Sequence, residues 1–417
     1  MSSPTLWRDA GFRRLWAGQT ASQLGEHTSL TLLPLIAVLT LGVGADQLGL
    51  LRAVGQAPLL LLTLVAGMAV DRWRTRTVMV VADLGRALAL TCVAALALRG
   101  GLDLPALLVV AVAVGALSAF FDVAYQASLV RLIARPHLLR ATSAVEGTRS
   151  AAQLGGPALA GTLMSLVSAP LAAAAGALFF VASLTGIARI REPRPLPSPA
   201  PGGLTAGVRF VATHPLLRTV CLASAAFQFC FAALMTAYLL FLPRDLGLSG
   251  AAIGVVLTAT GAGALAGSLL AARLPARYGH GPVVVLAALL GDGVLLLVPA
   301  LHGGPAFVLA ALLTINLVFG ALGQLVNVTL LAVRQAVTPA PLQGRVTAAI
   351  TFAGMGMTPL GSLTGGWLAA GWGLRPALAV TAAGMLLSPL LMALSPLARL
   401  GRDLPGPGSR VAGGAAP

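Results

Sequence analysis

The sequence is dominated by apolar runs of about 20 residues that are separated by short polar loops. An α-helix rises about 1.5 Å per residue, so a run of about 20 residues crosses about 30 Å of hydrocarbon. Only 9% of the 417 residues are charged and 57% are hydrophobic, whereas soluble domains carry about 25% charged residues. A chain with so little charge cannot cover a surface that faces water. The sequence therefore predicts an all-α polytopic membrane protein.

Twelve of these runs are long enough to span a bilayer. The predicted spans are 15–40, 49–70, 78–98, 104–128, 141–167, 170–190, 217–242, 251–274, 282–301, 305–333, 346–370 and 376–395. The proline-rich stretch 191–203 cannot form a helix and favours a semi-extended linker. The predicted organisation is an N-terminal six-helix bundle (1–190), a cytoplasmic linker (191–214), a C-terminal six-helix bundle (215–400) and a disordered tail (401–417). A short amphipathic segment, 208–213, is expected along the membrane surface.

Arginine positions predict the orientation of the spans. The net charge is +15, and with both termini in the cytoplasm only Arg99, Arg244 and Arg375 fall in external loops. This asymmetry is typical of multi-pass proteins of the plasma (inner) membrane. Losing one span would reverse every later loop, so the count is even. Because the charges are dispersed in short loops rather than concentrated, we expect no nucleic-acid partner.

Neither the cysteines nor the loop residues predict an enzyme. Cys92, Cys221 and Cys230 fall within predicted spans and lack the spacing of a disulfide frame or a metal site. There is no P-loop and no Ser-His-Asp arrangement outside the spans. We therefore expect no catalytic residues, no metal and no cofactor. Energy would come from a gradient, such as that of protons, or from a partner chain.

The first predicted span carries three polar residues on one face. Gln19, Gln23 and Glu26 are spaced i, i+4, i+7, which aligns them along a helix. A carboxylate in hydrocarbon is costly enough to imply a cavity or a partner. One interpretation makes Glu26 a proton carrier or a ligand for a cationic substrate. The alternative places it in the outer half of the span, wetted and structural.

The fourth and fifth predicted spans carry further polar faces. One holds Asp122, Tyr125 and Gln126, and the other holds Glu146, Arg149 and Gln153. Arg149 needs a counter-charge, and Asp122 and Glu146 are the expected partners. The pair is either static or has a carboxylate that binds a proton when Arg149 moves away. Burial raises the pKa of this carboxyl group whereas the charge of Arg149 lowers it, and the sequence does not show which effect is larger.

The second half of the chain has fewer acids within its spans. Its polar residues are expected to line that half of a pathway, or alternatively to hydrogen bond between helices; they are Gln228, Asn316, Gln324 and Asn327. Asp292 lies mid-span, and the sequence assigns it no role. In the third span Asp83 and Arg86 are one turn apart, which predicts a local pair.

The loop between the second and third spans resembles a motif of the major facilitator superfamily. Gly67 is followed by Asp71, Arg72 and Arg76, and a weaker repeat of the pattern begins at Gly267. Together with similar echoes elsewhere, this indicates two halves of the same orientation, each with six helices, related by an axis along the membrane normal. The resemblance implies the major facilitator fold, in which Asp71 and Arg72 would stabilise the state closed to the cytoplasm.

Three further stretches resemble the drug:proton antiporter branch that includes macrolide and siderophore exporters. They are Phe12 to Glu26, Ala119 to Ala124, and the fifth-span motif of Gly156, Pro157 and Gly161. The resemblance implies proton-coupled efflux of an amphipathic small molecule by alternating access, with the lipid bilayer as surroundings. The sequence does not determine the oligomeric state, although one chain already contains both halves of a pathway and could work as a monomer. The alternatives are nutrient or metabolite uptake by symport or facilitated diffusion, and a non-transporting sensor or lipid-handling protein on the same scaffold.

Overall fold

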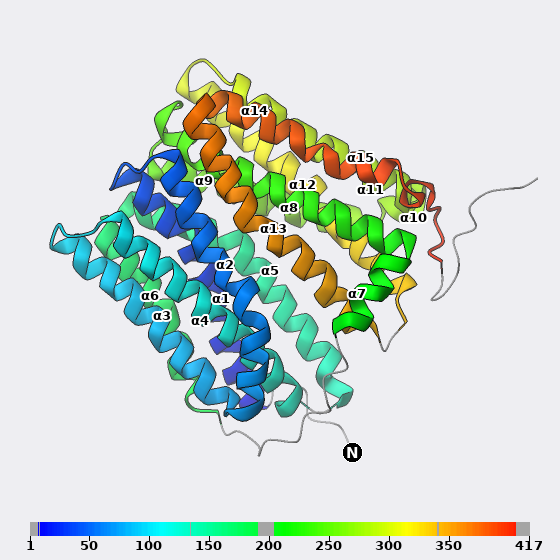
Figure 1. The fold of residues 1–417 in the computed structure, drawn as a ribbon, viewed down its shortest axis with the longest axis horizontal. Coiled ribbons are helices and arrows are strands. Elements are labelled where there is room, and N and C mark those ends of the chain that lie inside the picture. Colours follow the sequence, from blue (N-terminus) through cyan, green and yellow to red (C-terminus); the bar gives the residue numbers. More distant parts are fainter. Residues whose placement is uncertain (1–6, 8, 134, 191–203, 340–341, 406–417) are drawn as a thin grey trace, which may run out of the picture. The chain divides into compact units, whose positions relative to one another are not determined.

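The fold is seen in a computed structural model that describes residues 7, 9–133, 135–190, 204–339 and 342–405 (Figure 1). The side chains of 59–60, 63–72, 130–131, 135–140, 143, 146, 150, 154 and 204–206 are outside this description. So are most of the predicted linker, at 191–203, and most of the predicted tail, at 406–417. Within the described ranges all regular secondary structure is helical, as predicted.

Six helices come from the first half of the chain. They are α1 (Ala10–Leu39), α2 (Ala45–Arg72), α3 (Thr75–Leu98), α4 (Leu104–Leu132), α5 (Arg135–Leu166) and α6 (Ala169–Ile187).

The second half begins with a short helix and continues with longer ones. They are α7 (Leu204–Thr213), α8 (Pro215–Arg244), α9 (Gly250–Ala271), α10 (Leu274–Tyr278), α11 (His280–Gly293), η2 (Val294–Ala300), α12 (Pro305–Val337), α13 (Gln343–Trp372), α14 (Leu374–Met385), α15 (Leu387–Ala393) and η4 (Pro396–Arg399). Helix α7 contains the predicted amphipathic segment.

Each of the twelve predicted spans coincides with a helix or with two consecutive helical segments. In the described part of the chain, nine segments are by themselves long and apolar enough to cross a membrane. Two of the nine are composite, α11 with η2 and α14 with α15. The other three predicted spans coincide with α1, α2 and α5, which have 30, 28 and 32 residues. The polytopic helical fold class is therefore confirmed.

Aspartates just before two helices explain where those helices begin. The Asp9 carboxylate accepts hydrogen bonds from the backbone N–H groups of Gly11 (2.7 Å) and Phe12 (3.4 Å). Asp103 accepts one from the N–H of Ala106 (2.9 Å) at the start of α4. These carboxylates satisfy N–H groups that have no partner within the first helical turn. Helix α1 consequently starts before its apolar run does.

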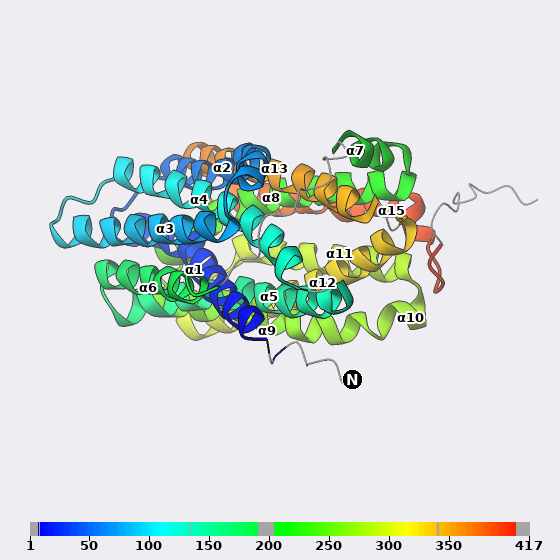
Figure 2. The ribbon, with the colours of Figure 1, turned by 90° about the horizontal axis from the view of Figure 1, so that it is seen from below.

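The helices form two compact units. The first comprises 1–199 with 248–258, and the second comprises 200–247 with 259–417. In the first unit α3 packs against α4 and α6, and α1 packs against α5 and α6 (Figure 2). Its core includes Phe12, Met79 and Phe121. In the second unit α8 packs extensively against α13, and its core includes Leu217 and Val346.

Candidate functional site

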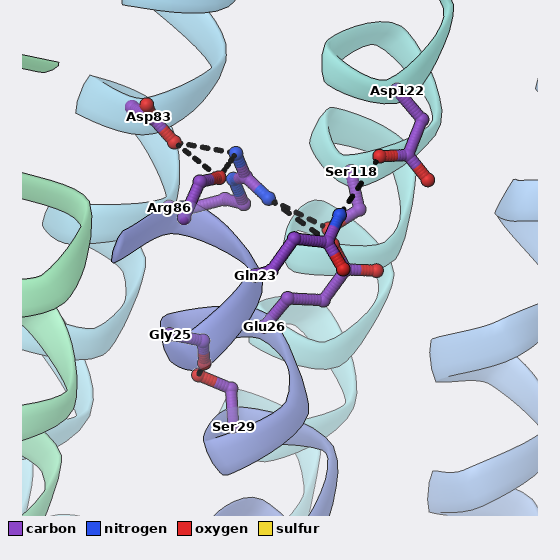
Figure 3. A network of polar contacts seen from close by, with 9 residues as sticks. Gln23, Gly25, Glu26, Ser29, Asp83, Arg86, Ser118 and Asp122 are labelled. Carbon is purple, nitrogen blue, oxygen red and sulfur yellow. Dashed lines mark hydrogen bonds and ion pairs between the residues drawn. The ribbon is translucent and has the colours of Figure 1, made fainter. Parts of the chain in front are cut away.

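Arg86 is the centre of a buried charged network in the first unit (Figure 3). It lies on α3 with no exposed surface. Its Nη2 donates to a carboxylate oxygen of Asp83, one turn earlier, and to the Oγ of Ser22 on α1 at 2.8 Å. Its Nη1 donates to the Oγ of Ser118 on α4 at 3.1 Å. The expected local pair with Asp83 is present, but Arg86 also joins three helices.

Aromatic rings complete the surroundings of this guanidinium. The Cζ of Arg86 lies 4.5 Å from the ring centroid of Phe121 on α4 and 4.5 Å from that of Phe180 on α6. Such cation–π contacts are stabilising when the cation is removed from water. They also exclude water from the side of the guanidinium that the carboxylates do not cover, which strengthens the remaining charge interactions.

Glu26 approaches the same guanidinium from α1. Its Oε2 lies 3.6 Å from the Nη1 of Arg86, and its side chain is 12% exposed whereas that of Asp83 is fully buried. Asp83 is further held by a hydrogen bond from Ser22 at 3.2 Å. Arg86 is therefore shared between a closely bound carboxylate and a second, more accessible one. A buried charge that loses its partner is strongly destabilising, so these groups constrain one another.

A second acid lies beside this network. The Nε2 of Gln23 donates to the Oδ1 of Asp122 on α4 at 3.3 Å, so two of the three predicted residues of α1 contact or approach the charged groups of the site. Arg149, on α5, was expected to pair with Asp122 or Glu146. Among the described side chains, however, it has no carboxylate oxygen within 4.0 Å. Its other expected partner, Glu146, has a side chain outside the described part.

Four other residues of the first unit that were predicted to line a pathway differ in how far their side chains are exposed. Gln19 and Tyr125 are buried, whereas Gln126 and Gln153 are exposed. Helical spacing alone placed all four on the polar faces. The structure brings Gln19 to the buried side of α1 and leaves Gln126 and Gln153 away from the Arg86 network.

The loop motif is only partly described. The backbones of Gly67, Asp71 and Arg72 belong to α2, but their side chains lie outside the described residues. The Nη1 of Arg76 donates to the carbonyl oxygen of Ile190 at 3.2 Å. This bond connects the start of α3 with the residues that follow α6, and the gating role expected for Asp71 and Arg72 stays a prediction.

The fifth-span motif permits close helix contacts. A Cβ atom added to Gly156 would lie 2.5 Å from the Cβ of His27 and 2.7 Å from the carbonyl carbon of His27. A Cβ on Gly161 would lie 2.1 Å from the Cα of Gly254, which belongs to the same compact unit. Pro157 lies within α5, between these two contacts. The motif therefore sets the distance between α5 and α1.

In the second unit the four predicted polar residues are neutral, and one of them, Asn316, joins several helices. Asn316 is buried, and its Nδ2 donates to the phenolic oxygen of Tyr238 at 2.8 Å. Its Oδ1 accepts from the Oγ1 of Thr260 at 3.1 Å, so it joins α8, α9 and α12. Asp292 is buried near the end of α11, and its carboxylate has no hydrogen bond or ion pair with a described residue. The others lie nearer the surface, with Gln228 and Gln324 half-buried and Asn327 exposed.

Arg86 is a residue of this site that the sequence analysis treated only as the local partner of Asp83 and did not include among the candidate site residues. The spacing to Asp83 predicts the local pair, but it does not say what lies opposite. The available signal was the position of this arginine within a predicted span, where a charge needs a buried partner or a cavity. The pairing with Ser22, Ser118 and the two rings depends on helix packing that no local pattern encodes.

Comparisons with known proteins agree with this architecture. The profile of the transmembrane secretion effector family matches residues 2–405. The multidrug efflux pump Tap of Mycolicibacterium fortuitum is 28% identical over 392 residues, which is 89% of this chain and 92% of that protein. Tap of Mycobacterium tuberculosis H37Rv is 28% identical over 377 residues, 84% of this chain and 85% of that protein.

Solved structures share the fold at low identity. An inward-facing, occupied bacterial homologue of the human lysosomal transporter Spinster has a TM-score of 0.73 at 14% identity and covers 95% of this chain and 98% of its own. A bacterial homologue of the iron transporter ferroportin, also inward-facing, has a TM-score of 0.72 at 15% identity, with 93% and 98% covered.

Proposed function

The chain belongs to the transmembrane secretion effector family of the major facilitator superfamily, and from that premise we propose that it exports an amphipathic small molecule in exchange for protons. A transporter of this superfamily binds a small-molecule substrate within the membrane. The similarity to the multidrug efflux pump Tap favours export of amphipathic compounds. The charged residues of the first unit support proton coupling.

The observation that carries the proposal is the sharing of Arg86 between Asp83 and Glu26. Asp83 is in direct hydrogen-bonding contact with the guanidinium, whereas Glu26 lies 3.6 Å from it and is partly accessible. When Glu26 is ionised, it attracts either Arg86 or a substrate cation. When Glu26 takes up a proton, that attraction is lost, and Asp83 and the serines still hold Arg86. A proton and a substrate cation would thus compete for one carboxyl, which is the requirement for exchange.

Asp122 extends this competition toward α4 and α5. Glu26, Asp83 and Asp122 are three described acids, and Arg86 is the described arginine that pairs with two of them, so when all three are ionised the carboxylates outnumber the arginine that pairs with them. In a low-dielectric interior, unpaired charge is costly. A proton or a cationic substrate would remove that excess. We propose that Gln23, which donates to Asp122, orients the carboxylate toward the exchanged cation.

The surroundings follow from the same proposal. We place the transporter in the plasma (inner) membrane with both termini in the cytoplasm, working as a monomer on the proton gradient without a cofactor. Neutral residues such as Gln228 and Gln324 would line the part of the pathway in the second half of the chain.

The test is flux in everted membrane vesicles with an imposed pH gradient, using the amphipathic cation ethidium as probe. We expect acidification of the vesicle lumen to drive uptake into the vesicles, which corresponds to export from the cell. Glu26→Gln and Asp122→Asn should each lower the gradient-driven rate by at least about tenfold, a loss typical of removing a proton-transfer group. Asp46→Asn, at an exposed position early in α2, is the matched control and should retain the rate.

Two outcomes would overturn the proposal. One is an unchanged dependence on the pH gradient when both acids are neutralised in a protein that is still inserted. The other is movement of probe only in the opposite direction, which would indicate symport or facilitated uptake.

A further inference from the structure

A polar pocket in the first unit lies beside the charged network. It is formed by α1, α2 and α4, and its polar lining residues are Ser29, Arg52 and Gln56. Apolar walls come from Leu33 and Pro34 on α1 and Val114 on α4. Ser29 follows Glu26 by three residues, which corresponds to about 4.5 Å along a helix axis. Figure 3 shows both residues on α1. The pocket is therefore adjacent to the Arg86 network but uses a different arginine.

Close packing of two glycines shapes this pocket. A Cβ atom on Gly115 of α4 would lie 2.0 Å from the carbonyl oxygen of Gly55 of α2, so the two backbones touch there. Arg52 and Gln56 are i, i+4 neighbours on α2 and lie on either side of Gly55, so both extend beside the crossing point. The Nε2 of Gln56 donates to the carbonyl oxygen of Arg52 at 3.4 Å, which orients the amide.

Arg52 has no counter-ion among the described residues. Its Nε is buried without a hydrogen-bond partner. The ion pairs found in the described part of the chain are those of Arg86 with Glu26 and Asp83, and of Arg375 with Asp245. The Nε of Arg86 also lacks a partner, but the terminal nitrogens of Arg86 contact two carboxylates and two hydroxyls. Arg52, in contrast, has no carboxylate oxygen within 4.0 Å among the described residues and lies in a pocket with mainly apolar walls. An unpaired guanidinium in such surroundings is expensive and marks a position where an anion would be stabilising.

We propose that this pocket binds an anionic oxygen group, a carboxylate or a phosphate, carried by an amphipathic molecule. The guanidinium of Arg52 would donate to two oxygens at once, the geometry for which arginine is suited. The hydrocarbon part of the molecule would lie against Leu33, Pro34 and Val114. The anion comes either from a transported amphiphile or from a phospholipid headgroup. This inference goes beyond the exchange of protons proposed for Glu26 and does not depend on it.

Binding is tested with the purified full-length protein in phosphatidylcholine nanodiscs, with dodecyl phosphate as the probe and dodecanol as its neutral counterpart. We expect dodecyl phosphate to raise the thermal stability of the wild type more than dodecanol does. Arg52→Gln should weaken the response to dodecyl phosphate at least about tenfold, because charge-assisted bonds are lost. Arg52→Lys should retain part of it, and the exposed loop variant Arg99→Gln should retain all of it.

A second readout separates a binding role from a structural one. Without an anion, Arg52→Met should be as stable as the wild type or more stable, because it removes a charge that has no partner while keeping an apolar stem. Phosphatidylglycerol in the nanodisc identifies the source of the anion. If the lipid headgroup is the ligand, this lipid stabilises the wild type but not Arg52→Gln, and it weakens the response to dodecyl phosphate. If a transported amphiphile is the ligand, the lipid has no such effect.

Two results would overturn the site. Equal responses of the wild type to dodecyl phosphate and dodecanol, in both lipid compositions, would show that the pocket does not recognise the anion. A large destabilisation of probe-free protein by Arg52→Met would show that Arg52 is structurally paired. Neither result would affect ethidium exchange through Glu26, so failure of this inference is distinguishable from failure of the proposed function.

Discussion

Arg86 is held so that it cannot be replaced by another cation without loss. Its two terminal nitrogens bind Asp83, Ser22 and Ser118 in different directions, while two rings cover the guanidinium plane. A lysine ammonium is a compact point charge and cannot make this planar, forked set of contacts. The shape of the site therefore requires arginine and not only a positive charge.

We expect Arg86→Met to destabilise the protein by about 3–5 kcal/mol, because it leaves Asp83 as an uncompensated buried charge. The double variant Arg86→Met with Asp83→Asn removes both charges and should recover most of that loss without recovering proton-driven flux. Unfolding in mixed micelles of increasing SDS content measures the stabilities. A double variant that is no more stable than Arg86→Met would contradict the assigned pairing.

The sequence pointed to two acids of this site, but it did not show that Arg86 lies at the centre of the network. A carboxylate within an apolar run is costly wherever it lies, so Glu26 and Asp122 could be identified from composition and spacing alone. The partners of Arg86 could not, because Phe121 and Phe180 lie on helices whose contacts with α3 are set by packing. Helical spacing also grouped Gln126 with Tyr125, although the structure leaves Gln126 exposed and buries Tyr125.

At the scale of helices, the contact between α1 and α5 depends on Gly156, and the neighbouring Gly155 offers a matched control. A Cβ on Gly156 would meet the His27 backbone, whereas a Cβ on Gly155 would have open space. We expect Gly156→Ala to destabilise the protein by about 1–3 kcal/mol through overpacking. Gly155→Ala makes the same chemical change and should be neutral or slightly stabilising, since alanine favours helix. Thermal unfolding in detergent measures both; equal effects of the two variants would contradict the close contact.

Arg375 links separate segments at one end of the second unit. Its Nη1 donates to the carbonyl oxygens of Pro299 (2.6 Å) and Leu301 (3.1 Å), and its Nε lies 3.4 Å from a carboxylate oxygen of Asp245. These bonds satisfy carbonyls where η2 ends.

We expect Arg375→Gln to cost about 1–2 kcal/mol, as for loss of charge-assisted hydrogen bonds at a half-buried position. Asp245→Asn should cost less, because the two bonds to carbonyl groups remain and an exposed ion pair contributes little. The same thermal unfolding measurement ranks the two variants, and a larger loss for Asp245→Asn would reverse the assigned roles.

The apolar runs predicted the helices themselves, because each run had to cross the membrane as one hydrogen-bonded segment. They did not predict the change from α11 to a 3₁₀ helix at Val294, or the division of the last span between α14 and α15. Each of these segments contains a proline, Pro299 in η2 and Pro389 in α15, whose nitrogen has no hydrogen to donate to the preceding turn. Asp292 precedes the first of these changes, at a position that the hydropathy pattern treats like any other in the span.

For the whole molecule, the even number of spans predicts that both ends of the chain lie on the cytoplasmic side. Green fluorescent protein fused after Leu400 should fluoresce, since it folds in the cytoplasm, and alkaline phosphatase fused there should be inactive. The reverse should hold for fusions at Gly247 and Gly303, which lie between helices on the side predicted to be external. This orientation follows from arginine counts in short loops. A fluorescent fusion at Gly247 together with a dark one after Leu400 would place the arginine-rich loops outside and would overturn the predicted orientation.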